Sequence, residues 1–147
     1  MLRFGSIKSA VFVILQFFII IYYFLTGSIF PKNIFLLIIY SFGLFLGLYS
    51  IIIMKFNFNI APDLKSGAIF IKRGPYKFIR HPMYTSVIII ILSLLINYFS
   101  IIRFVLFIVL ITVLILKSNY EEKILKEEFK EYSSYIFKTK KFLPYIY

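Results

Sequence analysis

Long apolar runs dominate the sequence, and short polar stretches separate them. The runs at 11–25 and 34–54 each approach the ~20 residues that a helix needs to cross a bilayer. A third apolar stretch, 83–117, is too long for one crossing and is interrupted by polar residues at 97–100. We therefore predict four transmembrane helices, of which the last two form a hairpin of two short helices.

Two of these runs carry a face of small or polar side chains. The face on the second run lets another helix approach closely, and packing within the chain is favoured over dimerisation. The face on the third run points into the bundle, because polar groups in hydrocarbon need partners. The faces consist of Gly43, Gly47 and Ser50 on the second run, and of Ser86, Ser93 and Asn97 on the third.

Beyond residue 117 the pattern becomes amphipathic and predicts one helix over 118–136 that leaves the membrane. At 100° per residue, one face is apolar and the opposite face is charged or polar. The apolar face holds Tyr120, Ile124, Leu125, Phe129, Tyr132, Tyr135 and Ile136, and the other holds Lys123, Lys126, Glu127, Lys130 and Ser134.

Acidic side chains lie on the apolar face of this predicted helix. Glu121 falls near its centre, Glu122 falls at its edge, and Glu128 leans toward it as a weaker candidate. A buried carboxylate is costly unless a cation or hydrogen-bond donors meet it. Glu121 therefore needs a positive partner, which is either Arg80 or a loop lysine in a salt bridge, or the ammonium group of a ligand.

Composition supports a membrane protein of one domain. The chain has 147 residues and is 61% hydrophobic, against roughly 45–50% in soluble domains, so lipid must cover much of its surface. It contains no cysteine and one histidine, so we expect no disulfide and no metal site. We divide the domain into two spans (1–54), a loop (55–82), a hairpin (83–117) and a tail (118–147).

The net charge of +11 reflects membrane topology and headgroup contacts, because the basic residues flank apolar runs; we do not expect nucleic acid as a partner. The first run is long and lacks a following cleavage site, so it is a span and not a signal peptide. Four spans put both termini and the basic loop on one side, which the positive-inside rule makes cytoplasmic. The Ile-, Lys-, Asn-, Phe- and Tyr-rich composition and the short form suit a prokaryotic inner membrane.

The polar sequence 74–84, GPYKFIRHPMY, stands at the start of the third apolar stretch. Pro82 suits the first turn of a helix, which places His81 at or next to its N-cap, where the helix dipole attracts an anion. Arg80 adds a fork that matches a carboxylate. Alternatively, His81 is a capping or packing residue, and Tyr76 and Tyr84 are interfacial aromatic residues.

Together, the loop and the acidic helix outline a site for a zwitterion. An anion can bind at the helix start, an ammonium group can meet Glu121 or Glu122, and a sulfonium can lie against tyrosine rings. S-adenosylmethionine has all three groups, although these arguments do not single it out from other zwitterions.

These residues resemble a known family. GPY…RHPMY at 74–84 is similar to the G-P-Y-x-x-x-R-H-P-x-Y signature of the isoprenylcysteine carboxyl methyltransferase and phospholipid methyltransferase family. The similarity extends over 59–147 and continues in a tail that resembles the family's E-E-x-x-L…F…Y…Y…P pattern. That tail consists of Glu121, Glu122, Leu125, Phe129, Tyr132, Tyr135, Leu143 and Pro144.

The resemblance implies an integral membrane methyltransferase that uses S-adenosylmethionine and methylates a lipophilic acceptor reached from the membrane. We expect Arg80, His81 and Glu121 to be essential for this activity. The cofactor pocket it implies is lined by Tyr76, Arg80, His81, Pro82, Tyr84, Glu121 and Glu122.

The chain departs from the family pattern at several positions. Ser86 replaces a common glycine, Lys130 stands where the tail loses a glycine and becomes one residue shorter, and Thr139-Lys140-Lys141 replaces a V-P-R-like segment. Lysine cannot reproduce the bidentate contact of arginine with a carboxylate, so these changes bear on the acceptor side.

Several acceptors and two other function classes stay open. Methylation of a lipid-linked carboxylate is favoured, and the amine of phosphatidylethanolamine or a small amine or thiol is the alternative. The other classes are an NADPH-dependent membrane reductase, since sterol reductases share an R-H-P-x-Y-like loop, and a non-catalytic membrane scaffold.

Overall fold

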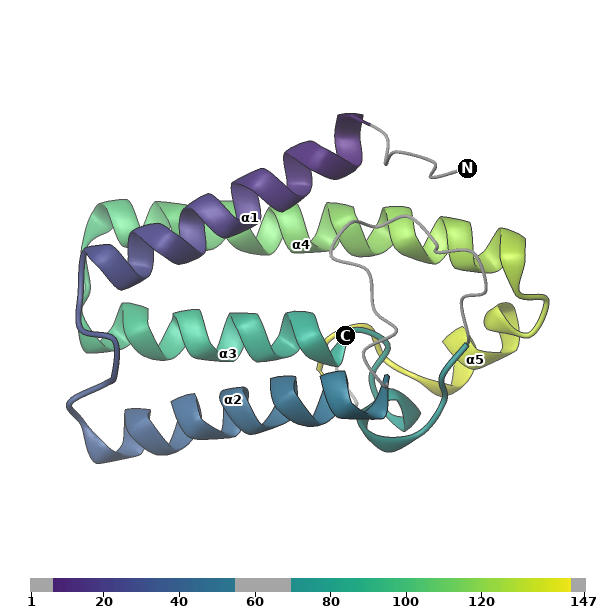
Figure 1. Ribbon diagram of the computed structural model, residues 1–147, viewed down its shortest axis with the longest axis horizontal. Helices are drawn as coiled ribbons and strands as arrows, with labels where there is room; N and C mark the ends of the chain where they lie inside the picture. The colour runs from purple at the N-terminus through teal and green to yellow at the C-terminus, as the bar shows by residue number, and fades with distance from the viewer. Residues whose placement is uncertain (1–6, 55–69, 144–147) are drawn as a thin grey trace.

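The computed structural model describes residues 7–54 and 70–143, in which turns and loops join the helices and the β-pairing is one isolated bridge. Four helices run back and forth, and two short helical segments gather at one end of the bundle (Figure 1). They are α1 (Ile7–Leu25), α2 (Ile34–Ile53), the 3-10 helix η1 (Gly74–Lys77), α3 (Pro82–Asn97), α4 (Ile101–Glu128) and α5 (Tyr132–Lys138).

The expected apolar helices are all present, but the hairpin is not a pair of short helices. Helices α2 and α4 are long and apolar enough to cross a membrane, and α1 and α3 are shorter apolar helices. Helix α4 has 28 residues and is about 42 Å long at 1.5 Å per residue, against a hydrocarbon core of about 30 Å. No glycine or proline interrupts it, so its last turns continue beyond the apolar run.

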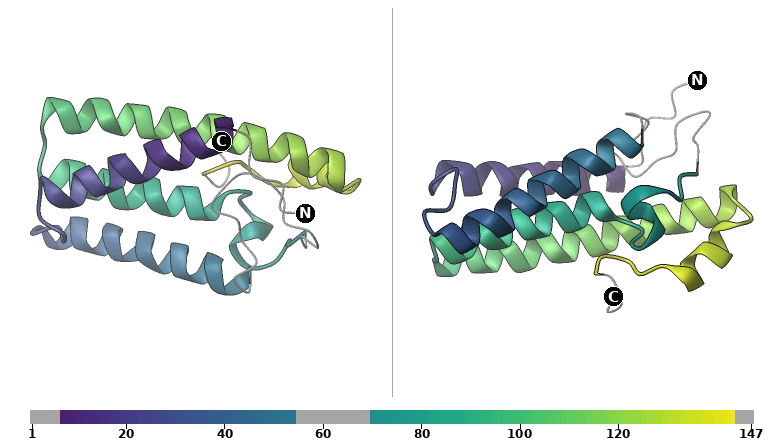
Figure 2. Two further views of the ribbon diagram at one scale, coloured as in Figure 1. Left: turned by 45° about the horizontal axis from the view of Figure 1, so that its top comes forward. Right: turned by 90° about the horizontal axis from the view of Figure 1, so that it is seen from below.

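The helices pack in pairs, α2 against α3 and α1 against α4, while α3 also contacts α4 and α1 (Figure 2). The small residues of α2 make its contact with α3 possible. A Cβ atom on Gly47 would lie 2.5 Å from Oγ of Ser86, and this hydroxyl donates to the carbonyl of Gly43 at 2.7 Å. The prediction of close packing within the chain is confirmed, and Ser86 fits because Gly47 has no side chain.

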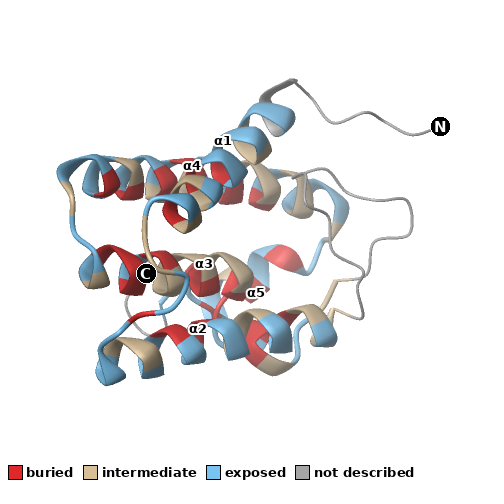
Figure 3. Cartoon of the chain, turned by 60° about the vertical axis from the view of Figure 1, so that its left-hand side comes forward, coloured by how far each residue is buried: buried red, intermediate tan, exposed pale blue. Residues whose placement is uncertain are grey.

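Apolar side chains line both the inside and the outside of the bundle. Tyr23, Leu94 and Leu114 are fully buried in the core. On the outward faces, Phe18 is 62% exposed and Phe45 is 64% exposed, and Figure 3 shows exposed residues on the outer sides of α1 and α2. Such surface is stable only against another apolar medium, which agrees with a protein embedded in lipid.

Residues 74–81, here named the motif loop, lie at one end of the bundle. Buried polar groups stabilise the opposite end. Arg103 is 1% exposed, and its guanidinium donates to the carbonyls of Tyr23 at 3.3 Å and Leu94 at 3.0 Å. These carbonyls lie near the C-terminal ends of α1 and α3, where a cation is favourable. Asn97, one member of the polar face predicted on α3, donates to Ser28 here at 2.8 Å. The other two bond elsewhere, Ser86 to α2 and Ser93 to a carbonyl of its own helix.

The lengths of α3 and α4 set which residues meet at the other end. Helix α3 has 16 residues, so it is about 24 Å long and returns only part of the length of α4. The same distance along α4, measured from the hairpin turn, reaches a point near Lys117. The start of α3 therefore lies beside the turns of α4 that carry Glu121 and Glu122, which His81 and Tyr84 contact. Figure 1 shows this end of α3 beside the second half of α4.

The prediction of one continuous helix over 118–136 is wrong. Helix α4 ends at Glu128, Phe129 is extended with φ −117° and ψ 107°, and α5 begins at Tyr132. The ring of Phe70 lies 5.5 Å from Phe129, 5.3 Å from Tyr132 and 5.0 Å from Tyr135, centroid to centroid. Packing around this ring favours the break over helix continuation.

The predicted faces of this segment are nevertheless largely confirmed, because Tyr132 and Tyr135 are buried and the opposite set is exposed. Glu128 is exposed at the end of α4, so the expectation that it leans toward the apolar side is wrong.

Candidate functional site

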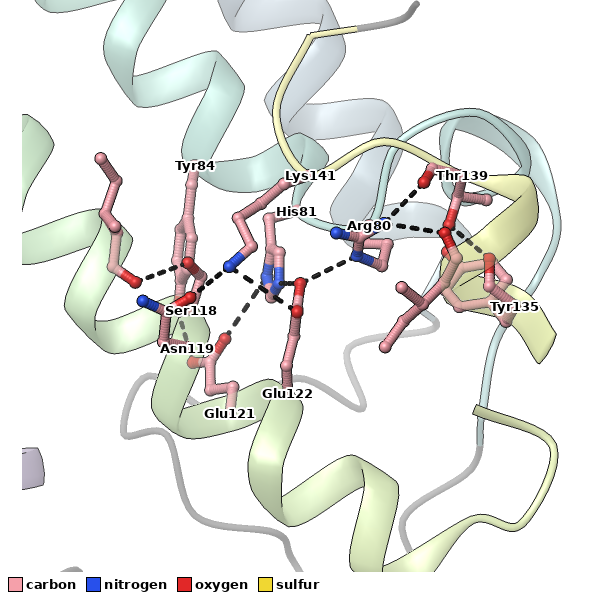
Figure 4. Close-up of polar contacts among 12 residues, drawn as sticks. Arg80, His81, Tyr84, Ser118, Asn119, Glu121, Glu122, Tyr135, Thr139 and Lys141 are labelled. Carbon is pink, nitrogen blue, oxygen red and sulfur yellow. Dashed lines mark hydrogen bonds and ion pairs between the residues drawn. The ribbon is translucent and has the colours of Figure 1, made fainter. Parts of the chain in front are cut away.

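The polar cluster lies at the bundle end where η1, the start of α3, the end of α4 and the C-terminal segment meet (Figure 4). His81 is the N-cap residue of α3, and Pro82 opens the helix, as the sequence predicts. The proline needs no hydrogen-bond partner in the first turn. The backbone therefore holds Arg80 and His81 directly at the junction with α4.

Glu122 is the most heavily contacted acid of the site. Its Oε1 accepts from Nε of Arg80 at 2.8 Å and lies 3.0 Å from Nε2 of His81. Its Oε2 lies 3.6 Å from Nζ of Lys141. The side chains of Arg80 and Glu122 are 10% and 11% exposed, so this ion pair is shielded from water and from salt.

Glu121 has weaker partners than Glu122. The hydroxyl of Tyr84 donates to its Oε1, and Nδ1 of His81 lies 3.5 Å from its Oε2. No lysine or arginine of the described residues forms an ion pair with it. The imidazole of His81 thus lies between two carboxylates, and it can donate to both only as the imidazolium.

Arg80 was expected to pair with Glu121 or to bind a ligand's carboxylate, but its direct partner is Glu122. Its Nη1 also donates to the carbonyls of Thr139 at 2.6 Å and Ile136 at 3.3 Å. Arginine presents five donors in a rigid fork, and here three of the contacts join α4, α5 and the C-terminal segment. Arg80 therefore organises the site in addition to any contact with a ligand.

Residues 139–143, here named the C-terminal strap, run along the motif loop. The amide of Arg80 donates to the carbonyl of Lys140 at 2.8 Å, and the amide of His81 donates to that of Lys141 at 3.1 Å. The hydroxyl of Thr85 donates to the carbonyl of Phe142 at 2.7 Å. The strap thus takes up two backbone N–H groups just before α3, next to the helix start at which the sequence predicts an anion pocket.

Aromatic rings enclose the same space. The ring of Tyr84 stacks on His81 with centroids 5.3 Å apart, and the ring of Phe142 lies 5.9 Å from His81. Tyr76 lies in η1, and burial raises the pKa of its hydroxyl. The hydroxyl of Tyr135 donates to the carbonyl of Tyr76, and burial raises the pKa of Tyr135 to about 12.

The structure thus brings together most of the residues singled out from the sequence, while Pro144 lies outside the described residues. Tyr76 and Pro82 contribute through η1 and the helix start. The five that form one connected polar group are Arg80, His81, Tyr84, Glu121 and Glu122.

Two lysines of the cluster were not singled out as site residues by sequence reasoning. Nζ of Lys117 donates to Oε1 of Gln16 at 3.0 Å and lies 5.1 Å from the ring centroid of Tyr84. Lys117 precedes Glu121 by four residues, which is one helical turn on the same face, and this spacing is the signal that could have found it.

Lys141 lies in the strap, where Nζ donates to Oδ1 of Asn119 and approaches Glu122. Burial lowers the pKa of Lys141, and the charge of Glu122 opposes this shift. This lysine stands in the segment that departs from the family pattern. It reaches the acids through a single ammonium, without the two-point contact that arginine makes.

The chain was also compared with known proteins. No curated protein matches it in a direct sequence comparison. The sequence model of the family described as phospholipid methyltransferase matches residues 31–132. This range covers more than half of the chain, and it includes α2, the motif loop and the α3–α4 hairpin with Glu121 and Glu122. The chain therefore belongs to the phospholipid methyltransferase family and is a membrane methyltransferase that uses S-adenosylmethionine.

Proposed function

We propose that the cluster around His81, Glu121 and Glu122 binds S-adenosylmethionine and transfers its methyl group to a lipophilic acceptor that arrives from the membrane. The observation that carries this proposal is the unequal pairing of two adjacent acids. Glu122 is held by Arg80, His81 and Lys141, whereas the described residues that contact Glu121 are Tyr84, through its hydroxyl, and His81 at 3.5 Å.

The donor set fits the cofactor. Glu121 keeps acceptor lone pairs for an ammonium group, because no lysine or arginine of the described residues forms an ion pair with it. Lys141 and Arg80 are the cations closest to a carboxylate bound beside the strap. The rings of Tyr84 and Phe142 suit a sulfonium, because aromatic faces attract cations.

When bound, S-adenosylmethionine supplies an electrophilic methyl group on a sulfonium. The chemistry it would supply is transfer of this methyl group to a lone pair of the acceptor, with the electron pair of the broken bond left on sulfur. Glu121, Arg80 and Lys141 would hold its amino-acid part. Arg80 and Glu122 hold His81 and the strap in place, which orients the reactants and excludes water. In this proposal Arg80, His81 and Glu121 are essential.

The acceptor decides whether the chain must move a proton. A carboxylate acceptor is already a nucleophile, and we favour O-methylation of a lipid-linked carboxylate for this reason. An amine, such as that of phosphatidylethanolamine, or a thiol must first lose a proton, and His81 is placed to accept it when Glu122 holds its other nitrogen. We place the site on the cytoplasmic side, where the basic residues gather.

Binding of S-adenosylhomocysteine to the detergent-purified protein tests the proposal. We expect calorimetry to give a micromolar dissociation constant that Glu121→Gln weakens at least tenfold and that NADPH does not change. Glu128→Gln is the matched control, because Glu128 is an exposed acid on the same helix, and it should bind as the wild type does.

Competition by NADPH would favour a reductase and refute this assignment. Absence of binding by a folded sample would refute the cofactor site and favour a non-catalytic membrane protein. Equal loss in both variants would show that the effect is not specific to Glu121.

A further inference from the structure

A buried lysine that forms no ion pair with any described residue lies beside the proposed methyl-transfer site. Lys117 is 2% exposed. Its ammonium donates to the neutral amide of Gln16 at 3.0 Å and lies 5.1 Å from the ring centroid of Tyr84. No carboxylate of the described residues forms an ion pair with it. One hydrogen bond therefore serves an ammonium that has three donors.

Burial of a lysine in this state is costly. A buried charge is stable in proteins when it is paired and hydrogen-bonded, and a tyrosine face gives only part of that stabilisation. Glu121, one turn further along α4, is the nearest acid in the sequence, but its oxygens are directed to Tyr84 and His81. Among the described residues, Lys117 thus has no anion in direct contact, and the charge of Glu121 acts on it from one helical turn away.

The position of Lys117 indicates what an anion in contact with it would belong to. It precedes Glu121 by four residues, so it lies about 6 Å further along α4 toward the middle of the bundle. Gln16 comes from α1, and Tyr84 comes from the start of α3. The three side chains meet between α1, α3 and α4, on the membrane side of the acids that the proposed function assigns to the cofactor.

We propose that Lys117 and Gln16 form a subsite for the anionic group of the lipophilic acceptor. A carboxylate or a phosphate ester has this chemistry: either can accept from the ammonium and from the amide nitrogen of Gln16 while its apolar chain stays between the helices. The subsite sets specificity by charge. Naming the ligand as the acceptor rests on the proposed function, whereas the anion site itself rests on the contacts of Lys117.

Binding of single-chain amphiphiles to the full-length protein in a nonionic detergent tests this subsite without requiring turnover. The probes are dodecanoate, dodecyl phosphate and uncharged dodecanol. Lys117→Met removes the charge at nearly constant size, and Lys123→Met is the matched control, because Lys123 is exposed on the same helix. Gln16→Glu places a carboxylate on the ammonium and should occupy the subsite from within.

We expect Lys117→Met to weaken binding of at least one anionic probe roughly 10- to 100-fold, which is the size of a hydrogen bond to a charged group. Dodecanol binding should not change, and Lys123→Met should bind all probes as the wild type does. Gln16→Glu should weaken the same anionic probe while the midpoint of thermal unfolding stays constant or rises. The anion that binds more tightly identifies the source, a lipid acid or a phosphate headgroup.

Three results would overturn the subsite: wild-type affinity for both anions in Lys117→Met, equal losses in Lys117→Met and Lys123→Met, or wild-type anion binding in Gln16→Glu. The last variant keeps the test decisive if Lys117→Met does not fold. S-adenosylhomocysteine binding, measured on the same samples, separates the two proposals. Its absence from the wild type, together with anion binding that depends on Lys117, would refute the proposed cofactor site and support the subsite.

Discussion

Two adjacent acids on α4 are expected to differ in role: Glu122 stabilises the fold, and Glu121 binds the cofactor. Matched substitutions of the two residues test this difference. Glu122→Gln removes the charge that meets Arg80, His81 and Lys141. Glu121→Gln is the same chemical change one residue earlier. We expect the first to lower stability and to loosen the strap, and the second to weaken cofactor binding with little loss of stability.

The magnitudes follow from the contacts. Breaking a buried ion pair costs about 3–5 kcal/mol when a charge is left uncompensated. An amide oxygen at position 122 can still accept from Arg80, which also keeps the carbonyl of Thr139 at 2.6 Å, so we expect a loss near 3 kcal/mol, at the lower end of the range. Glu121→Gln keeps an amide oxygen that can accept from the Tyr84 hydroxyl, and it weakens the contact with His81 at 3.5 Å. We therefore expect a loss of about 1 kcal/mol or less.

Thermal unfolding of the detergent-purified variants measures the difference. A loss of about 3 kcal/mol corresponds to a fall of about 6–12 °C in the unfolding midpoint for a chain of this size. Release of the strap should also speed tryptic cleavage after Lys140 and Lys141, which are held against Arg80 and His81 in the folded state. Equal falls in both variants, or an unchanged midpoint in Glu122→Gln, would refute the reasoning that Glu122 holds the strap.

Other predictions concern the helix bundle. Arg103→Met should lower the free energy of unfolding by about 3 kcal/mol, because the carbonyls of Tyr23 and Leu94 lose a buried cationic donor. Thermal unfolding measures this loss, and a change below about 1 kcal/mol would contradict the prediction. Gly47→Ala should be destabilising by about 1–3 kcal/mol, because its Cβ would lie 2.5 Å from Oγ of Ser86. Adding Ser86→Ala should restore part of that loss in a double-mutant cycle.

The helical bundle is largely predictable from the sequence because its information is local. Apolar runs predict the helices, the polar break at 97–100 predicts the hairpin, and the small residues of α2 predict its close contact with another helix. The hairpin also predicts which residues meet, since chain length fixes how far α3 returns along α4. The convergence of His81 with Glu121 and Glu122 is thus implied by a count of residues, once α4 is known to continue without a break.

The detailed pairing at the site could not be predicted in this way. Glu121 and Glu122 differ by 100° around α4, and which of them meets Arg80 depends on the rotation of α4 against α3. That rotation is set by the packing of many core side chains. The position of the strap could not be predicted from sequence patterns either. The parallel pairing of Ile79 with Lys140 joins residues far apart in the chain, and such pairing leaves no local periodicity.

Two departures from the family pattern, at Lys141 and Ser86, can be explained by the residues that contact them. Its lysine at 141 replaces an arginine-like position, but it does not act alone: Asn119 accepts from it, and Glu122 faces it at 3.6 Å. Arg80 also donates to the same carboxylate, through Nε at 2.8 Å. Lys141 therefore shares its contact with Glu122 with an arginine. The same logic applies to Ser86, whose added hydroxyl fits because its helix neighbour is Gly47. In both places the chain tolerates an altered motif residue because the partner residue, distant in sequence, shares the contact or gives up the space.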